Sequence, residues 1–134
     1  MATSAYGLIA GANRALSTYK AMSVETASPG ELVLMLYNES LRAMRDAQAA
    51  MDRKDIGCSS KSLIKAQDIV LELRTSLNPS AGKDVAANLE TMYGYVGGRL
   101  IEANIKKEQG PLRDAMKVMG NLRDGWQEAL GRHG

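Results

Sequence analysis

The stretch from Thr26 to Met51 constrains this chain most, because it predicts one long and unusually apolar helix. Ser28 suits the cap position and Pro29 the first turn, and Glu31 stands three residues after the cap, which is the capping-box pattern. At about 100° per residue the apolar side chains cover roughly 200°, against roughly 100° for a one-sided amphipathic helix. The extra apolar surface must therefore be covered by another part of the chain or by another protein.

Two leucines account for the width of this arc. Leu34 and Leu41, one heptad apart, lie beyond the edge of the stripe that would face a core. The stripe itself consists of Leu32, Val33, Leu36, Tyr37, Met44, Ala47 and Met51.

Length and composition exclude several classes of protein. The 134 residues make one domain by length, large enough to bury its own core. The net charge of +2 is too balanced to indicate binding to nucleic acid or to an anionic membrane surface. A single cysteine, Cys58, excludes an internal disulfide and fits a reducing compartment. No apolar run approaches the roughly 20 residues of a membrane span, and the N-terminus lacks a secretory signal, so we expect a cytoplasmic protein.

Turn signals divide the rest of the sequence into three more helices. Residues 55–60 resemble a turn, with Gly57 as the helix stop and Ser59 or Ser60 as the next cap. Further turns are expected at 78–82 and at Gly110-Pro111. The predicted helices span about 29–54, 61–77, 84–107 and 111–130.

Four long helices joined by short turns predict an all-α fold, an antiparallel up-down four-helix bundle. We assign the bundle to residues 26–131, a short N-terminal helical or extended cover segment with its link to residues 1–25, and a tail to 132–134. We expect Tyr37, Tyr93 and Trp126 to pack in the core or at its edge. The core stripe of the third helix consists of Val85, Leu89, Met92, Tyr93, Val96, Leu100 and Ala103.

The second and third helices also carry apolar residues outside their core stripes, whereas the fourth gathers its apolar residues on one face. This asymmetry predicts a hydrophobic groove on one side of the bundle. A close approach of a partner helix would explain Gly94, Gly97 and Gly98 of the third helix, and a local kink and plain tolerance, taken together, explain them about as well. The predicted groove residues are Leu34, Leu41, Ile64, Leu71, Ile101 and Ile105.

Residues that could carry catalysis or hold a cofactor are scarce. The only histidine, His133, lies in the terminal tail, whereas di-metal sites in helical bundles need Glu-x-x-His pairs. Cys58 has no basic or histidine neighbour in sequence that would mark it as a nucleophile. The glycines of the third helix lack the preceding strand and the lysine of a phosphate-binding loop. We therefore expect no enzymatic activity, no metal and no cofactor.

The sequence resembles the flagellin-specific export chaperone family of bacteria known as FliS. The resemblance begins with YKAMSVETASPGELVLMLY at residues 19–37, where a tyrosine and a short link precede T-A-S-P and L-x-x-M-L-Y. It continues through KAQDI at 65–69, through residues 89–104 with their ending RLIEAN, and through Leu122-Arg123 followed by Trp126. These blocks are similar to the family in the same order. Gly97 and Gly98 depart from it, since relatives tend to carry larger side chains there.

The resemblance implies a cytoplasmic chaperone that binds the disordered C-terminal segment of flagellin, prevents premature polymerisation and delivers the subunit to the flagellar type III export apparatus. We expect Leu8, Ile9 and Tyr19 of the N-terminal segment to shield the groove in the free protein. The competing hypothesis is a structural bundle that self-assembles through the same apolar residues without a disordered client. A homodimer stays open, as does docking of the export gate, an anti-sigma factor or a cochaperone.

Overall fold

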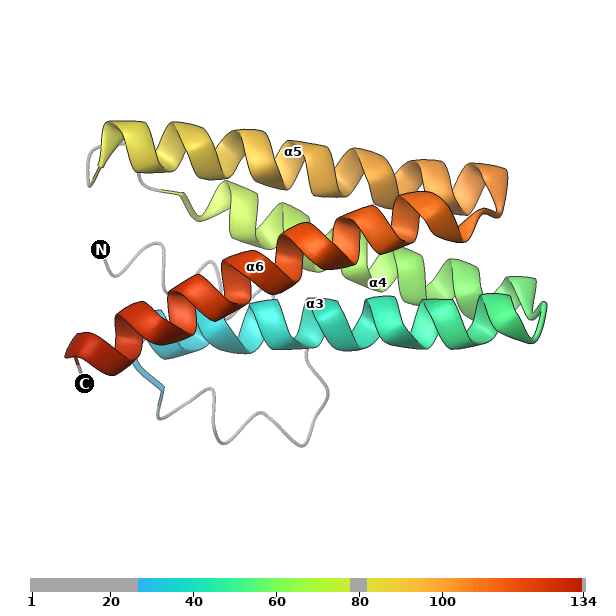
Figure 1. The fold of residues 1–134 in the computed structure, drawn as a ribbon, viewed down its shortest axis with the longest axis horizontal. Helices are drawn as coiled ribbons and strands as arrows, with labels where there is room; N and C mark the ends of the chain where they lie inside the picture. The colour runs from blue at the N-terminus through green and yellow to red at the C-terminus, as the bar shows by residue number, and fades with distance from the viewer. Residues whose placement is uncertain (1–26, 78–81, 134) are drawn as a thin grey trace.

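The computed structural model describes residues 27–77 and 82–133, and within them the chain forms four long helices. Each helix packs against two others, in the ring α3–α4–α5–α6, and successive helices run in opposite directions (Figure 1). The predicted all-α antiparallel four-helix bundle is thereby confirmed. The helices are α3 (Pro29–Asp52), α4 (Ile56–Thr75), α5 (Lys83–Lys106) and α6 (Gln109–His133).

The start of α3 follows the sequence prediction in detail. The Glu31 backbone N–H donates to Ser28 Oγ over 3.2 Å, and the Ser28 N–H donates to Glu31 Oε1 over 3.0 Å. These bonds satisfy two of the backbone donors that a helix start leaves without partners, and they lower the pKa of the Glu31 carboxyl. Pro29 occupies the first turn, where its missing N–H has no cost.

The predicted turn over residues 55–60 is wrong, because α4 already begins at Ile56. Asp55 caps it, with the Cys58 N–H donating to Asp55 Oδ1 over 3.0 Å, and Gly57 lies inside the first turn. α3 ends at Asp52, and Lys54, two residues further on, adopts the left-handed conformation with φ 58°. Glycine is the usual residue at that position, so a lysine there gave no stop signal in the sequence. The misplaced stop at Gly57 in turn moved the predicted cap from Asp55 to Ser59 or Ser60.

The core lies between the four helices, and its side chains come from all of them. Tyr37 and Tyr93 are 1% and 2% exposed, and Trp126 packs against the core while half-buried, as predicted. Fully burying a large apolar side chain contributes about 1.5–3 kcal/mol. The largest fully buried apolar side chains are Tyr37, Leu36, Met44, Leu63, Ile69, Leu73, Leu100, Leu112, Met119 and Val96.

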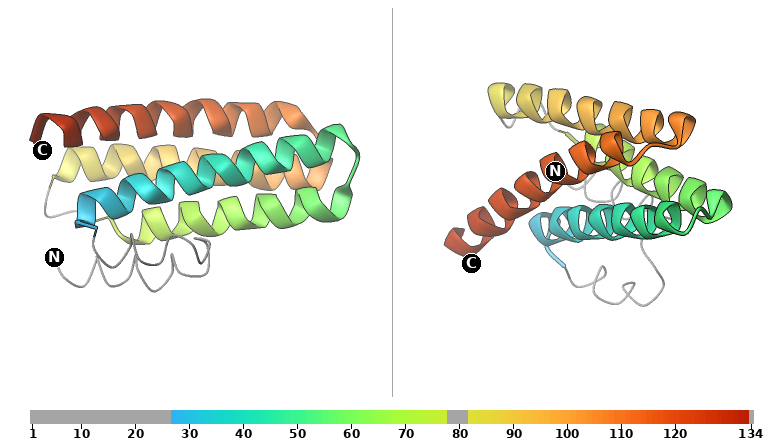
Figure 2. Two further views of the ribbon diagram at one scale, coloured as in Figure 1. Left: turned by 90° about the horizontal axis from the view of Figure 1, so that it is seen from below. Right: turned by 45° about the vertical axis from the view of Figure 1, so that its right-hand side comes forward.

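The two ends of the bundle differ. α5 and α6 lie close together at their shared turn and separate toward the other end of the molecule (Figures 1 and 2).

None of the described helices combines the length and hydrophobicity needed to cross a membrane. The predicted cover segment and its residues Leu8, Ile9 and Tyr19 lie outside the described residues.

Candidate functional site

A groove runs along the outside of the bundle between α4 and α5, with a volume of about 410 Å³. Leu71 forms part of its α4 wall and Ile101 part of its α5 wall, and they are 56% and 48% exposed. Both were predicted as groove residues from the sequence, and the structure places them on the same hollow. The complete lining is Gln67, Asp68, Val70, Leu71, Arg74, Tyr93, Gly94, Gly97, Gly98 and Ile101.

Two more predicted residues extend the apolar surface of the same two helices. Ile64 precedes Leu71 by one heptad on α4, and Ile105 follows Ile101 by one turn on α5, so each pair shares a helix face. Ile64 is 49% exposed and Ile105 is 74% exposed. Four of the six predicted side chains therefore lie exposed on α4 and α5.

Leu34 and Leu41 do not join this groove, so the prediction of one groove lined by all six residues is wrong. Leu41 is buried in the core cluster and Leu34 is half-buried. Helical spacing places both on the side of α3 that carries Gly30 and Asn38, which bond to α6. Trp126 Nε1 donates to the Gly30 carbonyl over 2.8 Å, and Arg123 Nη1 donates to Asn38 Oδ1 over 3.4 Å.

The wide apolar arc of α3 has a simple structural cause. This helix packs against α4 and α6, and Leu41, at the edge of the arc, belongs to the core cluster, so part of the wide arc is covered inside the bundle. The sequence left open whether the extra apolar surface of α3 is covered by this chain or by another protein. For Leu41, the cover is this chain. The sequence did not reveal which helix lies beside which, and this information decides whether a second apolar line is covered or open.

Behind the groove, a pair of tyrosines links α3 to α5. The hydroxyl oxygens of Tyr37 and Tyr93 are 2.5 Å apart and hydrogen-bonded, and either can be the donor. The Tyr37 ring also meets the Trp126 ring edge-on, with 6.3 Å between centroids. Burial raises the pKa of both phenols, and the neighbouring Tyr37 raises that of Tyr93 further. Both phenols are therefore neutral at pH 7, and the pair fixes the inner wall of the groove.

Charged residues frame the groove without forming a catalytic cluster. Arg74 Nε lies 2.6 Å from Glu90 Oε1, so this ion pair joins α4 to α5 at one end of the groove. Asp68 lies on the rim of its α4 wall and is exposed. Across residues 27–77 and 82–133, no three histidine, cysteine, aspartate or glutamate side chains gather closely enough to hold a metal ion. The groove has the character of a binding surface for apolar side chains.

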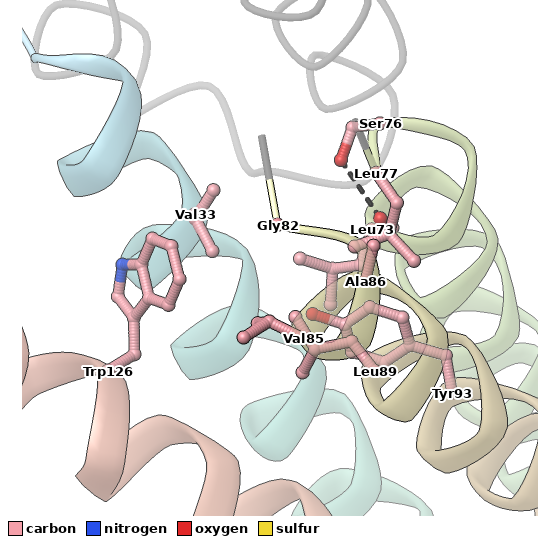
Figure 3. Close-up of a pocket in the computed structure, with 10 residues that line it drawn as sticks. All are labelled: Val33, Leu73, Ser76, Leu77, Gly82, Val85, Ala86, Leu89, Tyr93 and Trp126. Carbon is pink, nitrogen blue, oxygen red and sulfur yellow. Dashed lines mark hydrogen bonds between the residues drawn. The ribbon is translucent and has the colours of Figure 1, made fainter. Parts of the chain in front are cut away.

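A second hollow, of about 290 Å³, opens at the end of the bundle where α5 and α6 separate (Figure 3). Trp126 and Val33 lie on one side of it and Val85 and Leu89 on the other (Figure 3). The sequence placed Val85 in the core, yet it is 64% exposed. Tyr93, Val96, Leu100 and Ala103 of the predicted core stripe are buried, but the first turn of α5 extends past the point where α6 can cover it.

A third hollow lies between α5 and α6. It is lined by Thr91, Met92, Tyr95, Val118, Asn121 and Leu122. Met92, predicted as core, is 42% exposed there, and Tyr95 is 48% exposed. This hollow could not be predicted from the sequence, because the apolar residues of α6 fall on one face and resemble ordinary core positions.

Comparisons with known proteins agree with the resemblance found in the sequence. The family model described as "Flagellar protein FliS" matches residues 12–133. The chain is 40% identical over 114 residues to the flagellar secretion chaperone FliS of Bacillus subtilis (strain 168), which covers 85% of this chain and 84% of that protein. It is 30% identical over 117 residues to the flagellar secretion chaperone FliS of Vibrio cholerae, covering 84% of this chain and 86% of the relative.

A solved structure with low sequence identity to this chain also supports the fold. It is described as the crystal structure of a flagellar chaperone from bacteria, and it matches with a TM-score of 0.73 at 21% identity. The match covers 85% of this chain and 93% of the other. At this identity the likeness is one of fold.

The tyrosine pair gives a test of the inner wall of the groove. Tyr93→Phe leaves the buried Tyr37 hydroxyl without its partner, so we expect the free energy of unfolding to fall by about 1–3 kcal/mol. The double variant Tyr37→Phe/Tyr93→Phe removes both polar groups and should cost less than the single one. Urea unfolding at neutral pH measures both values, and a double variant that loses more than the single one would contradict this account.

The same pair predicts a loss of stability in alkali. A phenol has an ordinary pKa of 10.0, and burial raises that of Tyr37 and Tyr93 in the folded protein. Above about pH 10 the unfolded chain releases these protons while the folded chain holds them, so stability is present below that pH and is lost as pH rises. Urea unfolding between about pH 9 and pH 11 should show a smaller loss for the double phenylalanine variant than for the wild type.

Proposed function

The chain belongs to the FliS family, a family of flagellar secretion chaperones rather than of enzymes, and from this premise we propose that it binds the C-terminal segment of flagellin in the groove between α4 and α5. In this proposal the bound segment is kept from premature polymerisation in the cytoplasm. The complex then presents the flagellin subunit to the flagellar type III export apparatus.

The observation that carries the proposal is the pair of half-exposed apolar walls that face one hollow. Leu71 and Ile101 are about half exposed, and Ile64 and Ile105 continue the same faces. Each such side chain could contribute up to about 1.5–3 kcal/mol when fully buried by a partner, before the cost of ordering that partner. An amphipathic helix that lies in a groove with anchors at helical spacing uses contacts of this kind, and a disordered segment can become helical as it binds.

Binding is tested with a peptide that spans the flagellin C-terminal segment of the same bacterium. The chaperone hypothesis predicts a one-to-one complex by analytical ultracentrifugation and a gain of peptide helicity by circular dichroism. The competing hypothesis of a self-assembling structural bundle predicts oligomers of this chain alone. No binding at tens of micromolar peptide would favour the self-assembling bundle.

Two substitutions test the place of binding. Leu71→Gln and Ile101→Gln each replace a half-exposed apolar side chain with a polar one of similar length, so the fold should persist. We expect each to weaken peptide binding by about tenfold, measured by titration calorimetry. Ile56→Gln is the matched control, because Ile56 is 61% exposed but lies outside the groove lining. Equal affinities for all three variants and the wild type would exclude this groove.

The proposed cover has its own test. If Leu8, Ile9 and Tyr19 shield the groove in the free protein, deletion of residues 1–18 should expose apolar surface. We expect higher fluorescence of a hydrophobic dye and a changed affinity for the flagellin peptide. The shielding hypothesis fails if neither quantity changes.

A further inference from the structure

We propose, resting on the client-binding function above, that the glycine-lined part of the groove selects its client by size and charge. It takes one bulky apolar side chain of the docked segment over Gly97, with a basic side chain of the same segment beside Asp68. Gly97 and Asp68 are then specificity-determining residues, whereas Leu71 and Ile101 supply general apolar contact.

Among the described residues, nothing accounts for these three glycines. None of these three glycines has a φ in the left-handed region, so the backbone of α5 does not require glycine at 94, 97 or 98. A Cβ built on any of the three would meet no atom of a described residue within 4 Å, so packing against residues 27–77 and 82–133 does not require glycine either. By contrast, a Cβ on Gly30 would lie 2.8 Å from Leu130 Cδ2. Glycine in a helix is destabilising relative to alanine, and what it provides here is open space in the groove.

The hollow is bounded, which favours a single anchor over a long trough. The Arg74–Glu90 ion pair joins the two helices at one end, and Ile101 forms the wall near the other. The α5 segment from Glu90 to Ile101 spans about 16 Å at the helical rise. The volume of about 410 Å³ lies at the lower end of the range for pockets that enclose small ligands, which suits a large side chain.

The charged residues on the rim of the groove indicate which charged side chain the client should carry. Arg74 is neutralised by Glu90. Asp68 lines the same hollow, is exposed, and has no hydrogen bond or ion pair with any described residue. A client with a Lys or Arg close to its apolar anchor complements this carboxylate, and an acidic residue at that place would be repelled.

The anchor is tested by filling the hollow. Gly97→Leu should preserve α5, because leucine is the better helix former, while its side chain occupies the open space. We expect affinity for the flagellin C-terminal peptide to fall about tenfold by titration calorimetry. Gly125→Leu is the matched control: Gly125 is an exposed helical glycine of α6, equally free of contacts and outside the groove, and its substitution should leave affinity unchanged.

An alanine scan of the peptide locates the anchor. One large apolar peptide residue should lose about tenfold in affinity for the wild type when replaced by alanine, yet little further in Gly97→Leu, because both changes remove the same contact. Additive losses for every peptide residue, or an unchanged affinity in Gly97→Leu, would overturn the anchor while leaving the proposed function intact. A wild-type protein that binds no peptide would instead overturn the proposed function, and the anchor with it.

The charge is tested separately. Asp68→Asn should weaken binding about two- to fivefold at low salt, and the difference should shrink at high salt. Asp46→Asn, an identical change at an exposed site on α3 away from the groove, should have no such effect. Equal affinities for the two variants at low salt would overturn the role of Asp68.

Discussion

The packing of α3 between α4 and α6 is the constraint on which the rest of the structure depends. This helix buries apolar residues toward both neighbours, and α5 closes the ring between α4 and α6. α5 contributes its core stripe to the interior of the bundle. Its other apolar residues extend beyond the surface that α4 and α6 cover. Among the described residues, five of the eight exposed large hydrophobic side chains belong to α5: Val85, Met92, Tyr95, Ile101 and Ile105.

The proposed binding surface follows from this arrangement. α4 contributes Leu71 and α5 contributes Ile101 to one hollow, and the three glycines keep the space between them open. The tyrosine pair and Trp126 support the groove from within, by joining α3, α5 and α6 through two hydrogen bonds and ring contacts. A stable core and an incompletely covered outer face are therefore two results of the same packing, and the outer face is what the proposed client binding needs.

The sequence was sufficient for the four helices, because strong local signals mark them. The capping box at Ser28 and Glu31 forms as predicted, and the core positions of Tyr37 and Tyr93 follow from helical spacing. It failed at residues 55–60, where a lysine adopts the left-handed conformation and an aspartate, not a serine, caps the next helix. Local patterns favour glycine as a stop, and tertiary packing allowed the exception.

The candidate site could be predicted only in part for a related reason. Helical spacing identified Leu71 and Ile101 as apolar residues outside the core stripes, and it identified Leu41 in the same way. Whether such a residue is open or covered depends on which helix lies beside it, and that information is not local. The family resemblance supplied the chaperone role, which the comparisons confirm, whereas the hollows at the open end and between α5 and α6 needed the structure.

The central claim is that a flagellin segment lies between α4 and α5. Methyl NMR of the complex tests it most directly, with this chain labelled at its isoleucine, leucine and valine methyls and the flagellin C-terminal peptide unlabelled. The account predicts intermolecular NOEs from the peptide to Leu71 and Ile101, and none to the buried Leu41. NOEs confined to Val118 and Leu122 on the α5–α6 face, with none to Leu71 or Ile101, would contradict it.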